Sequence, residues 1–85
     1  MPYLGAYGSA VTEEISEQQN IPTGVYITHV QEDSPAMAAG IQNGDVIQEI
    51  KGMTVTGTAS YAKAVEKCKV GETIKVRGQR RGNGG

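Results

Sequence analysis

The chain is 85 residues long, which is enough for one small domain with a thin hydrophobic core. Its hydrophobic content of 38%, with 12 glycines, is ordinary for a folded domain and excludes an intrinsically disordered chain. The 8 basic and 9 acidic residues are interspersed, so the charge indicates neither a nucleic acid nor an anionic membrane as partner. No apolar run approaches the roughly 18 residues of a membrane-spanning helix, and no signal-peptide pattern follows Met1.

The candidate core consists of small and β-branched residues. Phe and Trp are absent and Leu4 is the single leucine, so Ala, Val and Ile carry the interior. An excess of β-branched residues favours a sheet. Because Cys68 is the one cysteine, an internal disulfide and a cysteine-based zinc site are excluded.

The first third of the chain predicts a loop, a strand, a short helix and a second strand. Residues 3–6 form a glycine-containing loop that runs into an extended segment over residues 7–11. Thr12 is an N-cap residue followed by two glutamates, and predicts a short helix that ends near Asn20. Residues 24–30 are rich in β-branched and aromatic side chains and give the clearest strand.

Turn and cap signals organise the middle of the chain. Ser34 followed by proline predicts a one-turn helix that ends at Gly40. An Asn-Gly turn at residues 43–44 precedes a predicted strand at residues 46–50. A Lys-Gly turn then leads into a short strand over residues 53–55.

The last third predicts the main helix and a final strand. Residues 58–69 carry apolar side chains at helical spacing: Tyr61, Ala64, Val65 and Cys68. A strand is predicted at residues 73–77, and we expect a domain of residues 1–78 with a flexible tail of residues 79–85. Together the elements predict an α+β fold, a small and partly open sheet with one main helix and two short ones.

The chain is poor in residues that catalyse. Because His29 is the one histidine, no histidine-based metal cluster can form, and no metal or cofactor is expected. A Cys68/His29 dyad is formally available, but Cys68 lies on the apolar stripe of a helix, which favours a buried structural role. Ser9 lacks the Gly-x-Ser-x-Gly elbow. We therefore predict no catalytic residue in this chain.

Three predicted elements have the properties of a groove for an extended peptide. A loop such as Leu4-Gly5-Ala6 can point backbone N–H groups at an anion. The strand after it, if it lies at a sheet edge, can pair with an incoming chain, and the helical stripe walls the other side. The residues alone leave an equal alternative, in which Leu4 and the stripe are core and Gly5 makes a turn.

The order Ser-Pro-Ala…Ala-Gly-Ile…Gly-Asp-x-Ile, together with Tyr-Leu-Gly-Ala near the start, resembles a PDZ domain. The segments that carry the resemblance are residues 3–6, 24–27, 34–41 and 44–47. Residues 12–24 further resemble the PDZ domains that follow the protease domain of bacterial HtrA/Deg serine proteases. The resemblance extends from residue 3 to about residue 77. It implies the circularly permuted, bacterial form of this fold, a small and partly open β-sandwich or barrel.

The resemblance implies a non-catalytic peptide-binding module of a parent serine protease in protein quality control, in an extracytoplasmic bacterial compartment. Its partners would be hydrophobic C-terminal or extended peptides, unfolded segments and the parent's protease domain, and the isolated domain is expected to be a monomer. The loop would bind a terminal carboxylate through backbone N–H groups, and the peptide would add to the next strand. The implied peptide-binding residues are Tyr3, Leu4, Gly5, Ala6, Tyr7, Gly8, Ser9, Tyr61, Val65 and Cys68.

Two departures from the family pattern keep other hypotheses open. Ala6 stands where the family usually has a larger aliphatic residue, and no further strand is predicted after residues 73–77. A second hypothesis places the same fold in an intramembrane or C-terminal-processing protease or a secretion component. A third makes the domain structural, with a groove that is self-occupied or packed on a neighbour; the small residues Ala6 and Cys68 favour it.

Overall fold

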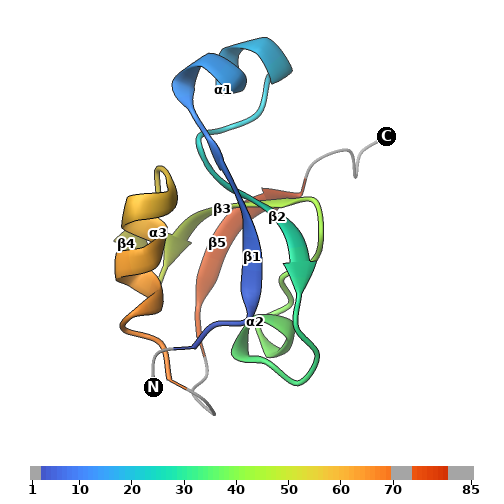
Figure 1. Ribbon diagram of the computed structural model, residues 1–85, viewed down its shortest axis with the longest axis vertical. Helices are drawn as coiled ribbons and strands as arrows, with labels where there is room; N and C mark the ends of the chain where they lie inside the picture. Colours follow the sequence, from blue (N-terminus) through green and yellow to red (C-terminus); the bar gives the residue numbers. More distant parts are fainter. Residues whose placement is uncertain (1–2, 70–73, 81–85) are drawn as a thin grey trace.

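The computed structural model describes residues 3–69 and 74–80. Within these ranges the strands are β1 (Ala6–Val11), β2 (Gly24–Val30), β3 (Asp45–Ile50), β4 (Met53–Thr54) and β5 (Val76–Arg80). The helices are α1 (Glu13–Gln19), α2 (Pro35–Ala38) and α3 (Thr58–Val65). The predicted α+β class, with one main helix and two short ones, is confirmed (Figure 1).

All strand pairings in the sheet are antiparallel. β1 pairs with β2, β2 with β3, and β3 with both β4 and β5, which leaves β1 at one end of the strand order. The β1–β2 register shifts once, because Tyr7 lies opposite His29 while Gly8 lies opposite Ile27. Thr28 is therefore an extra residue on β2, and its hydroxyl donates to the Tyr7 carbonyl at 3.3 Å.

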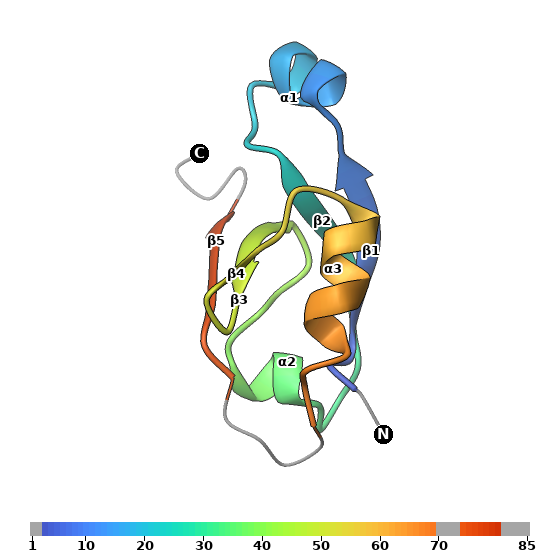
Figure 2. The same ribbon diagram turned by 90° about the vertical axis from the view of Figure 1, so that its left-hand side faces the viewer.

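The three helices lie at different places around the sheet. α3 runs beside β1, α2 lies near the N-terminal end of β1, and α1 projects beyond the far ends of β1 and β2 (Figure 1). In the view turned by 90°, α3 and β1 lie on one side of the molecule and β5 on the other (Figure 2). No helix in the described ranges is long and apolar enough to cross a membrane.

The core lies between α3, α2 and the sheet, and it consists of the small and β-branched side chains that the composition predicted. Its buried members are Leu4, Ala6, Val25, Ile27, Ala36, Ile41, Ile47, Ile50, Val55, Ala64, Cys68 and Ile74. Tyr61 and Val65 of α3 are half-buried against this cluster. The loop before β1 is thus anchored in the core by Leu4, which is 1% exposed.

The predicted caps are confirmed because each depends on local chemistry alone. Thr12 accepts the Ile15 N–H at 3.2 Å at the start of α1, and Asn20 ends the helix with a φ of 55°. Ser34 accepts the Met37 N–H at 3.1 Å at the start of α2. None of the α1 residues is buried, so the caps at Thr12 and Asn20 stabilise α1 more than packing in the core does.

Two predicted boundaries differ from the structure. α3 ends at Val65 and not at residue 69, because Lys67 and Cys68 donate to carbonyls three residues back, at 3.0 and 2.9 Å, and tighten the last turn. β5 is Val76–Arg80 and not residues 73–77, so it extends two residues past the predicted domain end at Gly78. A Cβ on Gly78 would lie 2.3 Å from the Val46 carbonyl oxygen, so this glycine permits close strand pairing. Residues 73 and 81–85 lie outside the described ranges.

Replacing Ser34 with alanine is expected to cost about 1–3 kcal/mol of unfolding free energy. The Ser34 hydroxyl donates to the Gln31 carbonyl at 2.6 Å and accepts from Met37, and at 3% exposed it has little water to replace these bonds. The matched control is Thr12→Ala at an exposed cap, expected to cost at most about 1 kcal/mol. Urea denaturation checks both, and equal costs would contradict the role assigned to burial.

Candidate functional site

The loop that leads into β1 is held by its carbonyl groups. The Leu4 carbonyl accepts the Ala36 N–H at 2.9 Å, and the Gly5 carbonyl accepts the Gln31 N–H at 2.7 Å. Tyr3 in turn donates its N–H to the Cys68 carbonyl at 3.2 Å. The loop is therefore fixed to α2, to the end of β2 and to the turn after α3.

The N–H groups of the same loop are available to a ligand. Within the described residues, neither the Leu4 nor the Gly5 N–H donates a hydrogen bond to the protein. Gly5 has a φ of 87°, a conformation that turns successive N–H groups toward one point and favours anion binding. Since buried N–H groups are nearly always paired, two adjacent donors without a protein partner indicate a binding position for a small anion such as a carboxylate.

The bond from Gln31 to Gly5 fixes which groups of β1 face β2. Ala6 lies opposite Val30, one position further along both strands. In an antiparallel ladder, residues whose polar groups point to the partner strand alternate with residues whose groups point away. The Ala6 N–H and carbonyl therefore point away from β2, and the Tyr7 carbonyl, which accepts the Thr28 hydroxyl, points toward it.

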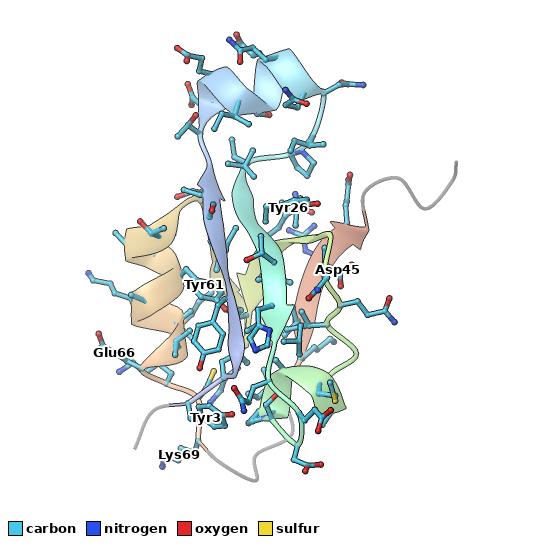
Figure 3. All side chains as sticks on the ribbon, turned by 45° about the vertical axis from the view of Figure 1, so that its right-hand side comes forward. Tyr3, Tyr26, Asp45, Tyr61, Glu66 and Lys69 are labelled. Carbon is cyan, nitrogen blue, oxygen red and sulfur yellow. The ribbon has the colours of Figure 1, made fainter. Side chains whose placement is uncertain are left out.

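The free edge of β1 faces α3. The Ala6 backbone groups lie on this edge, before the register shift between Tyr7 and Gly8. From α3 the Tyr61 hydroxyl donates a hydrogen bond to the Ala6 carbonyl, and the side chains of Tyr61 and Val65 are half-buried against the core. Figure 3 shows the Tyr61 ring directed from α3 toward β1. We call this region, the edge of β1 with Tyr61 and Val65, the β1–α3 seam.

The Tyr61 hydroxyl stays protonated well above neutral pH. Burial raises the pKa of Tyr61, and the nearby Cys68 thiol and Tyr7 phenol raise it further. The hydroxyl therefore remains a hydrogen-bond donor to Ala6 throughout the pH range in which proteins usually work.

The structure divides the residues that the resemblance implicates into three groups. Tyr3, Leu4, Gly5 and Ala6 form the loop, but Leu4 and Ala6 are 1% and 3% exposed and can offer only backbone groups. The residues Tyr7, Gly8 and Ser9 are exposed on β1, and the Tyr7 ring stacks on His29 with centroids 6.1 Å apart. On the α3 side, Tyr61 and Val65 are half-buried, whereas the side chain of Cys68 is fully buried in the core.

The thiol of Cys68 donates to the Ala64 carbonyl at 3.5 Å. Its full burial leaves no surface for a nucleophile to work from, and His29, stacked on the exposed Tyr7, is part of the outer face of the sheet. No group of three or more metal-ligating side chains is found among residues 3–69 and 74–80.

A cavity of about 300 Å³ lies elsewhere, between the turn after α2, β3 and β5. Asp45 is its one acidic residue, and the Asp45 carboxylate accepts the Gln42 N–H at 2.9 Å and so closes the turn before β3. This carboxylate serves the fold, and the cavity contains no group that belongs to the seam.

Sequence reasoning did not find the contact between Tyr61 and Ala6. The two residues are 55 positions apart, so no local pattern joins them. The one signal was the small size of Ala6 at a loop position that usually holds a larger residue. Gln31 and Ala36, which fix the loop carbonyls, carry no sequence signal because they act through their backbone N–H groups.

Comparison with known proteins decides the family. The family model described as PDZ domain matches residues 2–84. This chain belongs to the PDZ family. The predicted resemblance is thereby confirmed, and the domain is a protein-interaction module rather than an enzyme in its own right.

The relatives of this PDZ domain include bacterial serine proteases. It is 35% identical to the serine protease HhoB of Synechocystis over 93% of this chain and 22% of that protein. It is 37% identical to a DegP-like periplasmic serine endoprotease of Hahella chejuensis over 86% of this chain and 15% of that protein. The chain thus spans about a fifth or less of the length of these relatives.

A solved structure confirms the fold. The HtrA3 PDZ domain, crystallised with the phage-derived ligand FGRWV, superposes with a TM-score of 0.71 and covers 95% of this chain and 74% of that chain. At 23% identity this likeness establishes the fold of the PDZ domain alone.

Proposed function

We propose that this PDZ domain binds C-terminal peptides by strand addition to β1. The observation that carries the proposal is the pair of adjacent N–H groups, Leu4 and Gly5, which have no partner among the described residues. They lie at the start of a strand whose other edge pairs with no described strand. A terminal carboxylate on these donors starts the peptide at the loop, and its backbone then continues along β1.

The side chains along the seam suit a hydrophobic ligand. Tyr61 and Val65 are half-buried, and on this proposal they line one side of the bound peptide. Tyr7 and Ser9 are exposed on the outer face of β1, where they reach only the rim of a bound peptide. Because the seam has few large side chains to anchor a peptide, we expect a dissociation constant on the order of micromolar. This corresponds to a binding free energy of about −8 kcal/mol.

We further propose that the domain serves as the regulatory or substrate-binding part of an HtrA-like serine protease. Supporting this, the relatives that match most of the chain are serine proteases, several of them described as periplasmic endoproteases. The partners would be hydrophobic C-termini or unfolded segments and the parent's protease domain, in an extracytoplasmic bacterial compartment. On this proposal the isolated domain is a monomer.

A titration of the 15N-labelled domain with FGRWV tests the binding mode. The peptide is added once as the free acid and once amidated at its C-terminus. We expect the free acid to shift the amide signals of residues 4–11 and of α3, and the amidated peptide to bind about tenfold more weakly or worse, because hydrogen bonds to a charged group are strong. Equal shifts from both peptides would contradict the carboxylate mechanism.

A second candidate function is structural, with the seam closed by the domain itself. The hydrogen bond from Tyr61 to Ala6 favours it, because it occupies an acceptor on the edge that a peptide needs. In the titration above, this function is indicated if neither form of the peptide shifts any amide signal.

A further inference from the structure

The Tyr61 side chain spans the β1–α3 seam at the end next to the loop. Its hydroxyl donates to the Ala6 carbonyl, and its ring packs against the core. The Ala6 carbonyl is the first acceptor on the free edge after the Leu4 and Gly5 N–H groups. A peptide whose carboxylate lies on those donors therefore meets this acceptor with its first backbone N–H.

Tyr61 and an added strand require the same space. A strand that pairs with β1 lies about 4.8 Å from it. The Tyr61 hydroxyl is within hydrogen-bonding distance of the Ala6 carbonyl oxygen, which places it inside that gap. A carbonyl oxygen has two lone pairs, but the overlap in position prevents both donors from approaching along the free edge at once.

The sequence of β1 explains why a large side chain fits here. Position 6 of the strand holds alanine, where the family usually has a larger aliphatic residue. Its small side chain leaves volume beside the Ala6 carbonyl for the Tyr61 ring. Burial raises the pKa of Tyr61 further above neutral pH, so the hydroxyl is a hydrogen-bond donor in ordinary buffers.

We propose that Tyr61 is a built-in competitor of the peptide, holding the Ala6 carbonyl in the free domain so that a C-terminal strand binds only after displacing the hydroxyl. This inference rests on the proposed function. Only molecules in which the Tyr61 hydroxyl has left Ala6 can bind the peptide. The apparent dissociation constant therefore equals the intrinsic one divided by the fraction of such molecules. Removing the hydroxyl alone is then a gain of function.

The test is the affinity of FGRWV, as free acid, for the wild-type domain and for Tyr61→Phe. Phenylalanine keeps the ring in the core and deletes only the donor. We expect the dissociation constant of Tyr61→Phe to be about threefold to tenfold lower, the range that corresponds to one net hydrogen bond. Tyr26→Phe is the matched control, since Tyr26 is half-buried on β2 away from Tyr61 (Figure 3), and its affinity is expected to equal the wild type.

The outcomes separate this inference from the proposed function. An equal or weaker affinity of Tyr61→Phe would overturn the competitor role and leave peptide binding intact. No binding by any of the three proteins would overturn the proposed function itself. The carbonyl 13C shift of Ala6 in the peptide-free domain gives an independent readout: it should change in Tyr61→Phe but not in Tyr26→Phe, and an unchanged shift would also overturn the inference.

Discussion

Gly5→Ala is expected to remove about 2–4 kcal/mol of unfolding free energy and to abolish peptide binding. Two costs add at this position. The φ of 87° strains any L side chain, by about 1 kcal/mol. A Cβ here would also lie 2.3 Å from the Ser34 Cβ and 2.8 Å from its hydroxyl, and such overpacking costs typically about 1–3 kcal/mol.

The matched control for Gly5 is Gly52→Ala, in the turn between β3 and β4. Gly52 has a similar φ of 81°, but no described atom lies within 4 Å of the added Cβ. It should therefore cost only the backbone strain, about 1 kcal/mol, and leave peptide affinity unchanged. Urea denaturation and the FGRWV titration measure both variants. If the two substitutions cost the same, contact with Ser34 does not shape the loop.

Gly8→Ala is expected to cost about 3 kcal/mol and to separate β1 from β2. An added Cβ would lie 1.8 Å from the Tyr26 carbonyl oxygen and 2.9 Å from the Ile27 Cα. These are backbone atoms of the paired strand, which cannot rotate away as a flexible side chain does, so the cost should lie at the upper end of overpacking. The displaced β1 should also lose affinity for the peptide.

Gly57→Ala is the control for Gly8, because no described atom lies within 4 Å of its added Cβ and its φ of −178° is ordinary extended backbone. We expect it to cost less than about 1 kcal/mol. Amide exchange along β1 and β2 would show the difference, with protection lost in Gly8→Ala and retained in Gly57→Ala. Retained protection in both would mean that the strands absorb the extra methyl.

The elements predicted correctly are those whose cause lies within a few residues. Thr12 and Ser34 accept N–H groups three positions ahead, and Lys51 and Gly52 turn the chain with a φ of 52° and 81°. Such signals need no knowledge of the rest of the fold. The PDZ family could also be predicted from the sequence, because the glycine, proline and aspartate residues of its motif mark backbone turns.

The features missed by sequence reasoning depend on distant partners. Gly78 was interpreted as the end of the domain, whereas in β5 it permits close approach to Val46 of β3. The apolar stripe correctly predicted that Cys68 is buried, but it did not reveal that α3 ends at Val65. The Tyr61–Ala6 bond required the packing of α3 beside β1, and only the small size of Ala6 hinted at it.

Helix α1 gives the domain a segment of low local stability. It contributes no buried residue, and isolated helices shorter than about 12–15 residues are marginal in water. It can therefore open without exposing the core. Because the cost of closing a loop grows only slowly with its length, the connection between β1 and β2 tolerates insertion of a tag or a fluorophore-bearing segment. Such an insertion would leave the contact between Tyr61 and Ala6, at the other end of β1, undisturbed.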